Sequence, residues 1–128
     1  MNKLEYLKKY MQAQDPTLNI ILYSFDAQDD TTKILLTPFG GAPYQNIRED
    51  DLIQIKNRSA NKKEAYNKAQ DLYRLLAYKY TAIVYDTGVE VYRFSQILPI
   101  ARPGYVGVDQ NGYHVFSFNI KAVTAVTA

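Results

Sequence analysis

The chain has 128 residues, a net charge of +2, no cysteine and one histidine. This length fits one core, so we expect a single domain over residues 1–128. The missing cysteine excludes disulfide scaffolds, thiolate zinc sites and cysteine nucleophiles. The small charge does not indicate specific nucleic-acid binding, and the lack of a run of about twenty apolar residues argues against a membrane span. The lysine-containing start lacks the pattern of a secretory signal, so we expect synthesis in the cytoplasm.

The first part of the chain is predicted to form a helix and two strands. Apolar residues at helical spacing predict a helix over residues 2–13, which Asp15-Pro16 ends because the residue before a proline is pushed out of the helical region. Apolar stretches over residues 19–26 and 32–38 predict two strands. Their short polar link predicts an antiparallel hairpin.

Residues 39–51 show no regular pattern and are predicted to form a mobile loop. A glycine pair here is not followed by the lysine and hydroxyl residue of a phosphate-binding loop, so that function is disfavoured. Long loops often carry binding contacts, which makes the tip of this one a candidate contact region. That tip consists of Phe39, Gly40, Gly41, Ala42 and Pro43.

The centre of the chain is predicted to be a strand that leads into a long helix. Residues 52–57 alternate apolar and polar side chains, as in a strand with one wet face. Ser59 and Asn61 are candidate helix caps, and Asn61 with Glu64 has the spacing of a capping box. The buried face of this helix is predicted to contain Ala65, Ala69, Leu72 and Leu76, widened by Tyr73 and Tyr80.

The last part of the chain is predicted to add three strands. Residues 81–86 and 89–97 flank turn residues and predict a hairpin, and a connection rich in proline and glycine follows it. A tight turn at residues 109–112 then leads into a strand over residues 113–124. The order αβββαβββ predicts an α+β fold, with one mostly antiparallel (mixed) sheet and both helices packed on one face. The residues of the last strand expected in the core are Phe116, Phe118 and Ile120.

The side chains that catalysis needs do not converge in this sequence. His114 lies on the apolar side of its predicted strand, where we expect a partly buried histidine with one hydrogen bond. No motif places a nucleophile beside a base, and the acidic pairs lack the spacing of a calcium loop. We therefore expect no enzyme activity, no cofactor and no metal.

Charge is distributed unevenly along the chain. Residues 26–51 are mainly acidic, and residues 56–79 are mainly basic. One interpretation is two solvated surfaces; the other is that the acidic part of one subunit meets the basic part of the next, head to tail. Arg58 is the best single contact under the second interpretation, although it also suits carbonyls of its own subunit. The interface candidates are Asp29, Asp30, Glu49, Asp50, Asp51, Lys56, Arg58, Lys62 and Lys63, with Tyr78 as a tyrosine that lies off the buried helix stripe.

Three stretches carry a resemblance to a known family. They are GGAP at residues 40–43, IQIKNRSANKKEAYNKAQDLYRLL at 53–76 and RPGYVGVDQNGYHVFSFNI at 102–120. Their order and the length of the chain resemble the small minor capsid or tail-completion proteins, the tail terminator group, of long-tailed bacteriophages and prophages of Gram-positive bacteria.

This resemblance implies a structural virion protein that works by self-assembly. Such subunits form a ring, generally a hexamer, on the tail tube; the ring ends tube polymerisation and joins the tail to the head. The implied partners are other copies of the chain, the tail tube protein and a head-completion or connector protein, and assembly takes place in the host cytoplasm. The alternative is a monomeric accessory module that binds nucleic acid or protein through residues 56–79; light scattering of the purified protein separates the two.

Overall fold

A computed structural model describes residues 3–23, 33–41, 48–77, 83–86 and 91–125. These residues form two helices and one seven-stranded mixed sheet, which confirms the predicted α+β class. The elements are α1 (Lys3–Gln14), β1 (Ile20–Leu22), β2 (Ile34–Gly41), β3 (Arg48–Ser59), α2 (Lys62–Leu76), β4 (Ile83–Asp86), β5 (Val91–Pro99), β6 (Gly104–Val108) and β7 (His114–Ala125).

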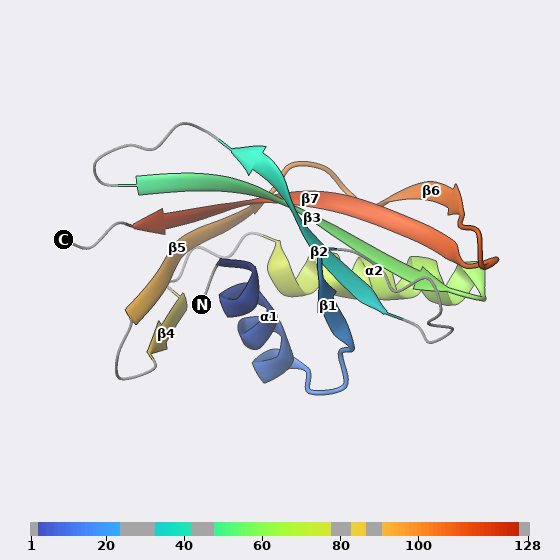
Figure 1. Cartoon of the computed structure of the whole chain (residues 1–128), viewed down its shortest axis with the longest axis horizontal. Coiled ribbons are helices and arrows are strands. Elements are labelled where there is room, and N and C mark those ends of the chain that lie inside the picture. The colour runs from blue at the N-terminus through green and yellow to red at the C-terminus, as the bar shows by residue number, and fades with distance from the viewer. Residues whose placement is uncertain (1–2, 24–32, 42–47, 78–82, 87–90, 126–128) are drawn as a thin grey trace.

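The sheet is built around β7, the last strand of the chain. The strand order is β1-β2-β3-β7-β5-β4, and β6 pairs with β7 outside this order. One edge of β7 pairs along its length with β3; the other edge pairs first with β6 and then with β5. Figure 1 shows the sheet as one twisted layer with both helices on the same side of it.

The core lies between this layer and the two helices. Strand side chains alternate between faces, so Ile53 and Ile55 of β3 point the same way as their β7 neighbours Ile120 and Phe118. Leu72 and Leu76 of α2 are buried against them, as predicted. We call this helix-covered side the inner face and the opposite side the outer face. The core cluster comprises Leu4, Tyr6, Leu7, Met11, Leu18, Ile20, Ile34, Leu36, Ile53, Ile55, Leu72, Leu76, Ile97, Phe118, Ile120 and Ala122.

The start of α2 forms as its sequence predicts. The Asn61 side chain accepts a hydrogen bond from the backbone N–H of Glu64 at 3.1 Å, which satisfies a donor that the first helical turn leaves open. The Glu64 carboxylate accepts a hydrogen bond from the Ser59 hydroxyl at 3.3 Å. Asn57, buried at the end of β3, donates to the backbone carbonyl of Ala65 at 2.8 Å. Together these bonds fix the angle at which α2 leaves β3.

The predicted hairpin between the first two strands is wrong. β1 and β2 pair in parallel, with Ile20 opposite Ile34 and Leu22 opposite Leu36. Parallel neighbours require the chain to return to the starting end of the first strand before the second begins, which a tight turn does not allow. β1 ends where Tyr23 adopts a φ of 74°, a left-handed conformation that breaks an extended strand.

Part of the predicted loop over residues 39–51 belongs to strands. Phe39, Gly40 and Gly41 continue β2, which shifts register against β3 between Pro38 and Gly41, and the φ of 89° at Gly40 suits that bulge. Residues 48–51 open β3 and pair with β7. Ala42 and Pro43 lie outside the described residues. The loop prediction is therefore wrong at both of its ends, because pairing with neighbouring strands outweighs the low strand propensity of glycine and acidic residues.

The connection predicted before the last turn contains a strand, β6. It pairs with the first half of β7, with a register shift between Tyr105 and Gly107 and a φ of 135° at Gly107. The turn at residues 109–112 is thus the turn of a β6–β7 hairpin. It is held by the Asp109 side chain, whose Oδ1 accepts from the backbone N–H groups of Asn111 and Tyr113 at 2.9 Å each.

Candidate assembly surface

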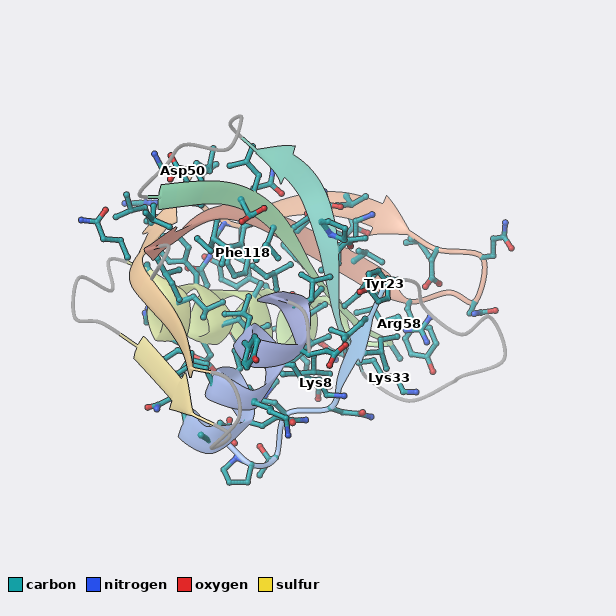
Figure 2. The ribbon with its side chains drawn as sticks, turned by 60° about the vertical axis from the view of Figure 1, so that its left-hand side comes forward. Lys8, Tyr23, Lys33, Asp50, Arg58 and Phe118 are labelled. Carbon is teal, nitrogen blue, oxygen red and sulfur yellow. The ribbon has the colours of Figure 1, made fainter. Side chains whose placement is uncertain are left out.

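The last residues of the acidic segment and the first residues of the basic segment lie at opposite ends of β3. Asp50 and Asp51 lie near its start, and Lys56 and Arg58 lie near its end. A strand rises about 3.3 Å per residue, so Asp50 and Arg58 are separated by roughly 26 Å along the strand. Figure 2 shows these two residues far apart on the subunit, with Lys33 on the side of Arg58. By strand alternation, Asp50, Lys56 and Arg58 share the outer face of the sheet.

Arg58 is buried within its own subunit. Only 2% of the residue is exposed, its Nη1 donates to Oδ2 of Asp109 at 3.5 Å, and its Cζ lies 4.9 Å from the centre of the Tyr113 ring. The guanidinium thus fastens the turn of the β6–β7 hairpin to the end of β3. Of the two roles that the sequence leaves open for Arg58, the structure favours the one inside the subunit, where the Asp109 carboxylate is one of its partners.

The two lysines that follow are exposed. Lys62 and Lys63 occupy the first turn of α2, beyond the cap at Asn61. The Nζ of Lys62 lies 4.2 Å from the centre of the Tyr105 ring on β6, which places an exposed ammonium over an aromatic face. Their charges thus lie at the surface, at the same end of the subunit as Arg58.

The β6–β7 hairpin places aromatic and apolar side chains at this end of the subunit. The Tyr105 hydroxyl and Nδ1 of His114 lie within hydrogen-bond distance at 2.9 Å, which confirms the half-buried, hydrogen-bonded histidine predicted from the sequence. On β6, Val106 and Val108 are 60% and 56% exposed. They line a hollow of about 220 Å³ together with Lys56, Gly107, Asp109 and Val115. The sequence did not predict strand β6, because the prolines and glycines in and around it are typical of turns. The apolar residues Val106 and Val108, two positions apart, were the signal that could have indicated a strand.

Several predicted residues are not placed by the structure. Asp29, Asp30 and Tyr78 lie outside the described residues, and Glu49 is placed only as a backbone position in β3, opposite Thr124. The proposed charge pairing between subunits stays a prediction at all of its positions. Within the part of the chain that the structure describes, no three histidine, cysteine or acidic side chains cluster in a way that could hold a metal ion.

Comparison with known proteins gives one finding for this chain. A family model described as bacteriophage tail terminator protein matches residues 6–126. No curated protein matches the chain. Neither helix that the structure describes is long and apolar enough to cross a membrane.

Proposed function

Because this chain belongs to the bacteriophage tail terminator family, we propose that it assembles as a ring, a hexamer by resemblance, on the end of the tail tube. The family has a structural role in the virion and implies contact with tail and head components. In the proposed ring, the subunits stop polymerisation of the tube and present the surface to which the head-completion or connector protein binds.

The separation of charge along β3 is the observation that carries this proposal. A cyclic ring of more than two subunits uses heterologous contacts, in which one patch meets a different patch on the next subunit. Asp50 and Asp51 at one end of β3, and Lys62 and Lys63 just beyond the other, supply two such patches. Opposite charges on opposite ends attract neighbouring copies head to tail and disfavour head-to-head pairs. Since Arg58 is engaged with Asp109, the exposed lysines rather than Arg58 provide the basic side.

The test reverses the exposed charges. Lys62→Glu with Lys63→Glu should leave the subunit folded, because acidic residues suit the first turn of a helix. Tails assembled with this variant should lack caps, lengthen beyond the parent's and yield few infectious particles, as electron microscopy and plaque counts would show. Lys8→Glu with Lys68→Glu makes the same change in net charge on α1 and α2, outside the proposed contact, and should cap tails normally.

A charge swap decides whether the acidic end is the true partner. Adding Asp50→Lys and Asp51→Lys to the Lys62→Glu, Lys63→Glu variant restores opposite charges across every junction, so capping should recover in part. If the lysine variant alone caps tails and produces infectious particles as well as the parent, charge pairing between subunits is ruled out.

A further inference from the structure

A cleft lies on the helix side of the subunit. It has a volume of about 610 Å³ and lies between α2 and the segment that joins β5 to β6. Among the described residues, its lining consists of Tyr66, Gln70, Tyr73, Arg74, Arg102 and Pro103. The first four recur at helical spacing, so they form one stripe along α2. A helix rises 1.5 Å per residue, so this wall runs for about 12 Å between Tyr66 and Arg74.

The aromatic part of this wall is held in place by the core. The Tyr66 ring packs edge-on against Phe116, with centroids 5.7 Å apart and an interplanar angle of 66°. Tyr73 packs in the same way against Phe118, at 5.8 Å and 78°. Such pairs restrict the tyrosine rings, and Tyr66 nevertheless remains 49% exposed. The cleft therefore offers a partner a preformed apolar wall with polar hydroxyl ends.

Both charged residues among the described lining are arginines. Arg102 is exposed, and the side chain of Arg74 is 77% exposed. The Asp71 carboxylate lies 3.9 Å from Nη1 of Arg74, but its side chain is itself 71% exposed, and such a solvated pair is weak. A guanidinium has five N–H donors, so Arg74 keeps donors for a second carboxylate.

We propose that this cleft binds an acidic peptide segment of a partner protein. Carboxylates of the segment pair with Arg74 and Arg102, and its apolar side chains pack against Tyr66 and Tyr73. The acidic strand of another copy does not fit, because Asp51 is paired on both sides, with Gly41 and with Ala122, and would have to leave its sheet. A nucleic-acid strand fits less well, because it presents a phosphate at every nucleotide and needs a longer row of cations.

The test measures fluorescence anisotropy with a short fluorescein-labelled peptide of alternating glutamate and leucine. The parent protein should bind this peptide, and binding should weaken as salt rises. The same peptide with lysine for glutamate should not bind. Arg74→Glu with Arg102→Glu should weaken binding by about tenfold or more, whereas Lys68→Glu with Lys121→Glu, which changes net charge equally outside the cleft, should stay within about twofold of the parent. The milder Arg74→Gln, Arg102→Gln variant should fall between them.

Three outcomes would overturn the proposal. They are equal binding of the glutamate and lysine peptides, equal loss of binding in the two charge-reversed variants, and tighter arginine-dependent binding of a labelled oligothymidylate, which would assign the cleft to nucleic acid. The proposal does not depend on ring assembly. Tail capping by the Lys62→Glu, Lys63→Glu variant tests the contact between subunits, and peptide binding by the same variant tests the cleft. Peptide binding that persists in this variant would support the cleft even if the variant no longer caps tails.

Discussion

The two faces of the sheet bury side chains by different means. On the inner face, α1 and α2 cover aliphatic side chains such as Ile53 and Ile55, which are at most 1% exposed. On the outer face, no described helix covers the end of β3, yet Arg58 is buried there by an ion pair with Asp109 and by the Tyr113 ring. Burial on the inner face is stabilised by the removal of apolar area from water. Burial of Arg58 on the outer face depends on its pairing with a group of opposite charge.

This difference matters for how a charged segment is interpreted. Arg58 and Lys62 lie four positions apart in a basic stretch, but one joins a hairpin to β3 and the other has its ammonium at the surface. A surface contact between subunits can use the second kind of residue and not the first. Mutations of buried residues on either face should therefore change the stability of the fold, whereas mutations of the exposed lysines should change the joining of subunits.

The largest loss of stability is expected on the inner face. Leu72 is 1% exposed between α2 and the sheet, so Leu72→Ala leaves a cavity and should lower the free energy of unfolding by about 2–5 kcal/mol. Urea denaturation followed by circular dichroism measures this. Asn67→Ala, at an exposed position of the same helix, should change it by less than about 0.5 kcal/mol. A Leu72→Ala protein as stable as the parent would show that the helix does not pack as described.

The outer face should respond almost as strongly to loss of one buried charge. Arg58→Ala leaves the Asp109 carboxylate without its guanidinium, and we expect a loss of about 3 kcal/mol, at the lower end of the range for buried pairs because Asp109 is a quarter exposed. Lys63→Ala is the matched control and should have almost no effect. A double-mutant cycle with Asp109→Ala should give strong coupling. Simple additivity would mean that the two side chains act independently.

Loss of the helix cap between β3 and α2 should have the smallest effect on the free energy of unfolding. Asn61 caps α2 where the chain passes from β3 to the helix, and Asn61→Ala should cost about 1 kcal/mol, whereas Asn61→Asp should retain most of the cap. Thermal unfolding of the three proteins makes the comparison. Equal losses for alanine and aspartate would argue that the side-chain bond to Glu64 does not contribute.

Patterns in the sequence correctly predicted those features that depend on residues close together in the chain. The helical spacing of Ala65, Ala69, Leu72 and Leu76 and the cap at Asn61 were predicted because neighbours in sequence decide them. The parallel pairing of β1 with β2, the strand character of residues 48–51 and the burial of Arg58 depend on partners distant in sequence. Arg58 meets Asp109 across 51 positions, and no local pattern joins them. For β6, the bulge at Gly107 interrupts the alternation from which a strand is normally predicted.

The position of β7 in the sheet has a consequence for synthesis of the protein. It pairs with β3, β5 and β6, but it comes after all of them in the chain. While the ribosome is still making β7, one edge of β3 is unpaired, and Ile53 and Ile55 lack their β7 neighbours Ile120 and Phe118. Such distant pairings form slowly because a long loop must close first. The nascent subunit therefore completes its sheet only after translation has passed β7, and a chain stopped before that point exposes an apolar strand edge that favours aggregation.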